Sequence, residues 1–290
     1  MNQPKLVSYF SSGTIPLQRA LERPYTHIIL AFLSCSEHSP FTLELSGAIA
    51  AQPSPPILTQ GTKQAVRQLQ QQGIKVMISF GGATMTSSAY RQLVGQESYL
   101  AYILAQFVIQ NELDGIDIDW EDSAAFVGRA GYDGIGFLVN LTLALRRELP
   151  SDRYLISHAP QPPYLESGYG MSGYLKVLEQ AGSAIDLVNI QFYNNRPWSG
   201  DPLRIVESYQ RYCQLPGMNV DKAILGLPVS RHNAQANSYL PVDRIISQVI
   251  QPLKAAHCLG GLMNWEFASD TEGHWSHPVS EALEAQRVTG

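Results

Sequence analysis

The amino-acid sequence alternates, along almost its whole length, between short apolar runs and longer amphipathic stretches. Eight apolar runs can be distinguished; several are rich in Val, Ile, Tyr and Phe, and most are bounded by Gly, Pro, Asn or Ser, as strands usually are. They cover residues 5–10, 27–33, 75–82, 113–121, 154–161, 185–194, 223–229 and 260–267. We therefore expect eight short strands.

Helical patterns fill most of the gaps between these runs. The segment 61–73 places Val66 and Leu69 at helical spacing and ends on a glycine, a signal for a helix C-terminus. The other helical patterns cover 98–113, 131–150 and 243–257. Eight strands alternating with helices over roughly 250 residues predict an α/β protein with a (β/α)8 barrel, the TIM barrel.

We expect this barrel to be a single domain over residues 1–290, because the sequence has no clear linker or low-complexity segment. The proline-rich segment 50–61 is interpreted as a surface loop. The alternative fold is an open doubly wound sheet, but no GxGxxG motif follows the first strand.

Composition and charge exclude several classes of protein. A formal net charge of −5 and a pI near 5.8 argue against a nucleic-acid partner, which would need a basic patch. No apolar run is long enough to cross a bilayer, so we expect no membrane partner. The start of the sequence lacks the layout of a signal peptide. Localisation stays open: secreted if a leader or other domains were removed, cytoplasmic otherwise.

Cysteines and histidines form no metal-ligand pattern. We interpret Cys35, Cys213 and Cys258 as free thiols, with one disulfide and a leftover thiol as the alternative. His274 and His277 lie three residues apart, but no third ligand is apparent. We therefore expect no metal and no cofactor.

The run 113–121 is unusual because it concentrates carboxylates in an otherwise apolar strand. Strand side chains alternate in direction. One face therefore carries Asp117, Asp119 and Glu121, and the other carries Ile116, Ile118 and Trp120. If the apolar face packs against the helices, the three carboxylates point into the barrel mouth, where such barrels hold their catalytic groups. Asp114 has the opposite parity and is expected to be structural.

Crowded carboxyl groups that share protons have separated pKa values, with one group held protonated near neutrality. We expect that group to be Glu121, which would then be a general acid, with the charge kept at Asp119. A calcium loop is the alternative for this motif, but Ile118 and Trp120 and the absence of a glycine at the sixth loop position argue against it. A serine hydrolase is not supported, because the sequence lacks a GxSxG elbow.

Several motifs resemble those of glycoside hydrolase family 18, the chitinases and their relatives. "DGIDIDWE" at 114–121 resembles the family's DxxDxDxE signature, and "SFGG" at 79–82 resembles its SxGG motif. "QFYN" at 191–194 and Trp265 resemble the motifs of the sixth and eighth strands. "APQPP" at 159–163 resembles a segment of the plant hevamine-like and bacterial single-domain branch. The motifs occur in the family's order and cover nearly the whole chain.

The resemblance implies hydrolysis of β-1,4-linked N-acetylglucosamine polymers with retention, in which the substrate's own acetamido oxygen attacks the anomeric carbon and forms an oxazolinium ion. It implies that Glu121 is the general acid and then the base. Asp119 would orient the acetamide N–H, Asp117 would share a proton with Asp119, and Tyr193 would donate a hydrogen bond to the acetamide oxygen.

Further residues are expected to bind substrate. Trp265 offers a flat apolar floor for a sugar, although a tryptophan taken alone is more often core, and Gln191 can hydrogen-bond the substrate. The other candidates are Tyr9, Phe32, Gly81, Gln161, Asn194 and Trp198. For Trp198, sugar stacking and packing are both open. Gly81 and Gly82 are expected to serve the backbone by letting the strand turn close to the site.

His158 has the opposite parity to Ser157 and Ala159 and is interpreted as a packing residue that faces the helices, with modulation of the site as the alternative. The α+β insertion of many family members, between strands seven and eight, is missing, which predicts an open groove and internal cuts. The expected partner is chitin or an N-acetylglucosamine oligosaccharide, and the expected state is a monomer. The alternatives are an endo-β-N-acetylglucosaminidase acting on N-glycans or related polymers, and a non-catalytic chitin-binding lectin.

Overall fold

The computed structural model describes residues 4–49 and 56–285. Part of the surface loop expected at 50–61 therefore lies outside the described residues. The strands are β1 (Lys5–Phe10), β2 (His27–Ser36), β3 (Ser39–Leu45), β4 (Lys75–Gly81), β5 (Gly115–Asp119), β6 (Leu155–His158), β7 (Leu187–Gln191), β8 (Ala223–Pro228) and β9 (Gly261–Trp265).

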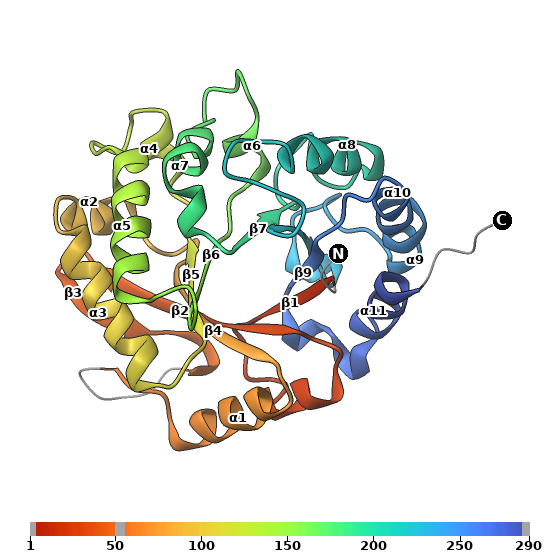
Figure 1. The fold of residues 1–290 in the computed structure, drawn as a ribbon, viewed down its shortest axis with the longest axis horizontal. Coiled ribbons are helices and arrows are strands. Elements are labelled where there is room, and N and C mark those ends of the chain that lie inside the picture. Colours follow the sequence, from red (N-terminus) through yellow and green to blue (C-terminus); the bar gives the residue numbers. More distant parts are fainter. Residues whose placement is uncertain (1–3, 50–55, 286–290) are drawn as a thin grey trace.

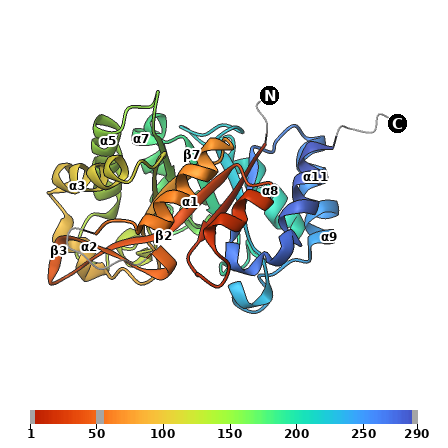
Figure 2. The ribbon, with the colours of Figure 1, turned by 90° about the horizontal axis from the view of Figure 1, so that it is seen from below.

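Eight of these strands are parallel and follow one another around a closed sheet, in which β1 pairs with both β2 and β9. Helices surround this sheet (Figures 1 and 2). The prediction of a TIM barrel is thus confirmed. That one domain extends over the whole of residues 1–290 stays a prediction.

The helices are α1 (Gln60–Gln71), α2 (Ser87–Leu93), α3 (Glu97–Gln110), α4 (Ser123–Phe126), α5 (Gly134–Glu148), α6 (Pro162–Leu165), α7 (Tyr174–Ala181), α8 (Pro202–Tyr212), α9 (Val242–Ile245), α10 (Gln251–Ala255) and α11 (Ser276–Glu284). Side-chain caps define several of their starts. Thr59 accepts a hydrogen bond from the N–H of Thr62 before α1, and Asp201 caps α8, which begins on Pro202.

Two parts of the fold differ from the sequence-based expectation. Strand β3 was not expected; it pairs antiparallel with the end of β2 and makes a hairpin outside the parallel barrel. Pro40 lies at its start, as is tolerated on an edge strand. The single helix expected over 243–257 is divided by a π-helical segment, Ile246–Ile250. Pro252 follows this segment, and it lacks the N–H that a regular α-helix would use there.

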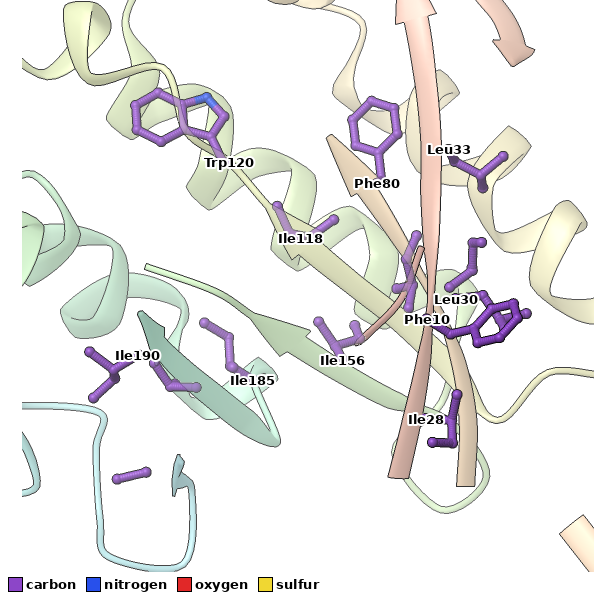
Figure 3. Close-up of a cluster of buried hydrophobic side chains, with 14 of the residues drawn as sticks. Phe10, Ile28, Leu30, Leu33, Phe80, Ile118, Trp120, Ile156, Ile185 and Ile190 are labelled. Carbon is purple, nitrogen blue, oxygen red and sulfur yellow. The ribbon is translucent and has the colours of Figure 1, made fainter. Parts of the chain in front are cut away.

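Apolar side chains fill two layers. The outer cluster lies between the strands and the helices and includes Ile116, Ile118 and Trp120, as expected from their parity (Figure 3). A smaller cluster fills the inside of the barrel and contains Tyr9 and Tyr193. The alternation along β5 therefore sends its carboxyl groups into the barrel.

Within residues 4–49 and 56–285, no helix is both long and apolar enough to cross a bilayer. The same part of the chain holds no group of three or more His, Cys, Asp or Glu side chains arranged to bind a metal ion. Cys35, Cys213 and Cys258 are all buried free thiols, as expected.

Candidate active site

Asp117 lies inside the barrel as a fully buried carboxyl group. It accepts hydrogen bonds from the hydroxyls of Tyr9 (2.8 Å), Ser79 (2.7 Å) and Ser157 (2.5 Å), and a longer one from the amide of Asn189 (3.5 Å). Burial raises the pKa of Asp117, while these hydrogen bonds act in the opposite direction. Four different strands thus hold this one carboxyl group in place, since its partners come from β1, β4, β6 and β7.

Asp119 and Glu121 lie next to each other and share a hydrogen bond. Burial, and then the charges of Glu121 and Asp117, raise the pKa of Asp119 well above its ordinary value. Burial also raises the pKa of Glu121, but hydrogen bonds from Gln191 and Asp119 lower it. The raised pKa values of both groups favour one proton shared between the two carboxyl groups.

We expected this proton on Glu121, and which of the two carboxyl groups carries it stays a prediction. Asp119 is the more buried of the two and lies between two other carboxyl groups, so its charged form is the more costly one. Burial and the neighbouring charges thus favour a proton on Asp119, in a hydrogen bond to Glu121, in the unliganded site.

The ends of β4 and β5 meet closely at this site. The N–H of Gly82 donates a 2.7 Å hydrogen bond to the carbonyl of Asp119. Gly81 has a φ of +114°, and a Cβ on it would lie 2.3 Å from the same carbonyl oxygen. Only glycine fits there, so the expectation that Gly81 and Gly82 serve the backbone is confirmed.

A pocket of about 590 Å³ opens at the carboxyl ends of the strands above the acidic pair. It is lined by Phe32, Ser46, Ala83, Thr84, Asp119, Glu121, Gln161, Gln191, Tyr193, Asn194, Asn195, Gln235 and Trp265. Most of the predicted site residues are therefore brought together in one concave space with aromatic, amide and carboxyl groups.

Gln191 connects the amide side of the pocket to the acidic pair. Its Nε2 donates to Asp119 at 2.9 Å, to the carbonyl of Ala159 at 2.9 Å and, at 3.5 Å, to Glu121. Burial and the three carboxyl groups raise the pKa of Tyr193 well above 10, so its hydroxyl stays protonated and can donate. Trp265 is half-buried and packs on Tyr9 and Phe32, at 5.8 and 6.0 Å between ring centroids.

Three predicted substrate-binding residues do not line this pocket. Tyr9 is buried beneath it and donates to Asp117. Gly81 contributes backbone geometry, as described above. Trp198 is only 5% exposed: its indole N–H donates to Glu166 at 3.1 Å, and the ring of Tyr169 packs on it edge-on. The packing alternative for Trp198 thus holds, and its assignment to substrate stacking is corrected.

Two residues expected to be structural are structural. The carboxylate of Asp114 accepts from the backbone N–H of Val76 and from the side chains of Gln70 and Lys75. His158 is fully buried among the helices between Thr142 (3.1 Å) and Tyr174 (2.9 Å). Burial lowers the pKa of His158 to about 3, so its ring is neutral.

Sequence reasoning missed five lining residues: Ser46, Ala83, Thr84, Asn195 and Gln235. Ala83 and Thr84 directly follow the SFGG motif and Asn195 directly follows QFYN, so proximity to a motif was an available signal. Gln235 had no such signal, because it lies in the long connection after β8. Its N–H donates to the side chain of Asn194, which brings that connection to the pocket.

Comparison with known proteins adds an independent line of observation. A family model described as "Glycosyl hydrolases family 18" matches residues 5–240. An acidic endochitinase of Arabidopsis thaliana is 30% identical over an alignment of 225 residues, and the match covers 73% of this chain and 68% of that protein.

Solved structures are similar as well. A GH18 chitinase from Pseudoalteromonas aurantia is 51% identical, with a TM-score of 0.93 over 96% of this chain and 99% of that one. A tamarind chitinase-like lectin has a TM-score of 0.65 at 18% identity, covering 95% and 99% of the two chains, which shows the shared fold alone.

Proposed function

This chain belongs to glycosyl hydrolase family 18 as a chitinase-type glycoside hydrolase, and from that membership we propose that it cleaves the β-1,4 links of chitin with retention at the anomeric carbon. The observation that carries the proposal is the hydrogen-bonded pair of Asp119 and Glu121, both with raised pKa values, beside the donor Tyr193 in a single pocket. The three groups match what a substrate-assisted cleavage requires.

In the proposed reaction, one N-acetylglucosamine residue lies on the indole of Trp265 with its acetamido group between Asp119 and Tyr193. Tyr193 donates a hydrogen bond to the acetamido oxygen and fixes it below the anomeric carbon. The acetamide N–H donates to Asp119. That hydrogen bond favours the charged form of Asp119, so its proton moves to Glu121.

Glu121 then donates this proton to the glycosidic oxygen, and the bond from that oxygen to the anomeric carbon breaks. The acetamido oxygen forms the new bond to this carbon, giving an oxazolinium ion whose positive charge lies beside the Asp119 carboxylate. A water molecule attacks the same carbon from the side of the departed chain. Glu121 takes the proton of that water, and the bond to the acetamido oxygen breaks. Two inversions give retention.

Asp117 is proposed to act through Asp119 rather than on substrate, because the carboxyl groups of Asp117 and Asp119 interact as neighbouring charges. We also propose internal cleavage. The connection between β8 and β9, residues 229–260, contains short helices and no strand, and all of it is described. No added wall therefore rises from this connection, which favours an open groove.

The test compares labelled chitin oligosaccharides with a high-mannose glycopeptide, using wild type, Glu121→Gln and the control Glu207→Gln. Glu207 is exposed on α8. We expect wild type and Glu207→Gln to cleave the chitin oligosaccharides, and Glu121→Gln to lose a factor of about 10² to 10⁴ in kcat.

Other outcomes would contradict parts of the proposal. Full activity of the Glu121→Gln variant would show that Glu121 is not the general acid. Cleavage of the glycopeptide alone would indicate an endo-β-N-acetylglucosaminidase, and binding of chitin without cleavage by wild type would indicate a lectin. Failure of a thiazoline mimic of the oxazolinium ion to inhibit would argue against participation of the acetamido group.

A further inference from the structure

A second concave surface lies on the outside of the barrel, between helix α3 and the β2–β3 hairpin. It is a groove of about 380 Å³, distinct in its residues from the pocket above the acidic pair. In Figure 1, α3 and β3 lie together at the outer edge of the molecule. The groove's side chains include Phe41, Thr42, Tyr102, Gln106 and Gln110.

Exposed aromatic rings border this groove. Tyr99 and Tyr102 are 50% and 48% exposed, although each presents a large apolar ring to water. Phe41, on β3, packs on Tyr99 with 5.1 Å between the ring centroids, so the hairpin and the helix form one continuous aromatic surface. A contiguous exposed surface of this kind on a globular protein indicates a binding role.

The spacing along α3 gives this surface a direction. Tyr99, Tyr102, Gln106 and Gln110 are separated by three, four and four residues, which places them in one row along a helix. At 1.5 Å per residue this row is about 16 Å long. An elongated ligand lying along α3 would therefore meet two aromatic rings and then two amide groups.

The chemistry of the groove selects a neutral ligand. All nine lining residues within the described part of the chain are uncharged, although the chain has 20 basic and 25 acidic residues. Aromatic rings that meet the apolar C–H face of a pyranose, with amides and a hydroxyl for its polar edge, suit a saccharide. An uncharged polysaccharide is thus complementary to the groove in charge, in shape and in its mixture of apolar and polar surface.

We propose that this groove is a second binding site for a chitin chain, which holds the enzyme on its polymer away from the site of cleavage. The proposal rests on the proposed function for the identity of the polymer. Hydrolysis of a short soluble oligosaccharide needs only the pocket above Asp119 and Glu121. Stable binding of the enzyme to insoluble chitin uses both this pocket and the groove.

The test uses the double variant Tyr99→Ala/Tyr102→Ala and the control Leu203→Ala, which removes another exposed apolar side chain, 67% exposed on α8. Binding to insoluble chitin is measured in a Glu121→Gln background, so that the polymer stays intact. Hydrolysis of a labelled chitin oligosaccharide is measured with Glu121 present. Thermal unfolding checks that both variants fold, which is expected because exposed substitutions change stability little.

We expect the double variant to bind insoluble chitin roughly three- to tenfold more weakly, as the loss of aromatic contacts implies, with oligosaccharide hydrolysis unchanged. Leu203→Ala should change neither. Unchanged chitin binding by the double variant would overturn the proposal, and so would an equal loss of oligosaccharide hydrolysis. A change in sedimentation velocity without a change in chitin binding would show that the surface joins two copies of the chain. Failure of wild type to cleave the oligosaccharide contradicts the proposed function alone.

Discussion

Burial raises the pKa of both Asp119 and Glu121, and the charges of Glu121 and Asp117 raise the pKa of Asp119 further. This crowding suits the proposed reaction, which needs a proton near neutrality and a carboxylate as soon as the substrate's acetamide arrives. The four donors around Asp117 keep its charge in a place where water does not reach it. Asp117, whose charge is costly to bury, therefore raises the pKa of its neighbour Asp119.

Replacing Asp117 by Asn should shift the alkaline limb of the pH profile of kcat/KM to lower pH. The limb reports the loss of the proton held by Asp119 and Glu121. The charge of Asp117 raises the pKa of Asp119, so removing that charge lowers this pKa, and the proton is lost earlier as the pH rises. The variant should also lose about 1–3 kcal/mol of stability, because an amide cannot accept from all the surrounding donors. Initial rates of hydrolysis of a chitin oligosaccharide, measured over a range of pH values, give the position of this alkaline limb.

The matched control is Asp122→Asn. Asp122 is also buried and accepts from Tyr132 at 2.8 Å, but the main charges that raise the pKa of Asp119 are those of Glu121 and Asp117. The alkaline limb of the pH profile of Asp122→Asn should lie at the same pH as that of wild type. Equal shifts in both variants would mean that the effect comes from general loss of stability and not from the charge of Asp117.

At the scale of the elements, features that follow from sequence periodicity could be predicted. Features that depend on tertiary contacts could not. Strict alternation along β5 was enough to sort Asp117 and Asp119 to the inside of the barrel. The hairpin strand β3 was missed, because "SPFTLEL" contains a proline and its partner is the polar end of β2. Trp198 was ambiguous because its burial depends on Glu166 and Tyr169, from the connection between β6 and α7. Which of Asp119 and Glu121 carries the proton could not be predicted from this alternation, because it depends on their relative burial.

Gly81→Ala should both destabilise the barrel and reduce activity, because the new Cβ would lie 2.3 Å from the carbonyl oxygen of Asp119. Either β4 or β5 must shift, and the φ of +114° is strained for alanine. We expect a loss of about 3 kcal/mol or more in the free energy of unfolding. A displacement of Asp119 by about 1 Å should reduce kcat on a chitin oligosaccharide by about 10². Denaturant unfolding and initial rates measure the two effects.

Gly95→Ala separates backbone strain from collision. Gly95 also has a positive φ, +82°, but an added Cβ there would meet nothing within 4 Å. That variant should lose only about 1–2 kcal/mol and keep its activity. A Gly81→Ala variant that behaves like Gly95→Ala would show that the close approach of β4 and β5 does not position Asp119.

For the whole molecule, closure of the barrel is what turns separate motifs into one site. Tyr9 lies in the first strand and Trp265 in the last, 256 positions apart, yet their rings pack together because β1 pairs with β9. The order of the strands could be predicted from the sequence, and with it the convergence of these motifs. The contribution of Gln235 could not, because its place depends on how a long connection folds back over the barrel mouth.

His158 should make the stability of the whole chain sensitive to acid. In the folded state, the hydroxyl of Thr142 donates to the carbonyl of Leu138, so it accepts from Nε2 of His158, and Nδ1 accepts from Tyr174. Burial lowers the pKa of this neutral ring to about 3, whereas an unfolded histidine titrates near 6.5. The stabilisation is therefore complete above about pH 6.5 and is lost as the pH falls towards 3, since only the unfolded chain takes up the proton in that range.

Replacing His158 by Gln should accordingly make the decline of stability between pH 6 and pH 4 less steep by about 1.4 kcal/mol per pH unit, the value for one proton. Denaturant unfolding at several pH values gives this slope. The absolute stability should also fall, because the glutamine repeats the two hydrogen bonds imperfectly, but that loss is the same at each pH. In the control His274→Gln, the replaced side chain is 76% exposed, so the slope should stay that of wild type. Parallel slopes for wild type and His158→Gln would show that the buried ring takes up a proton without unfolding.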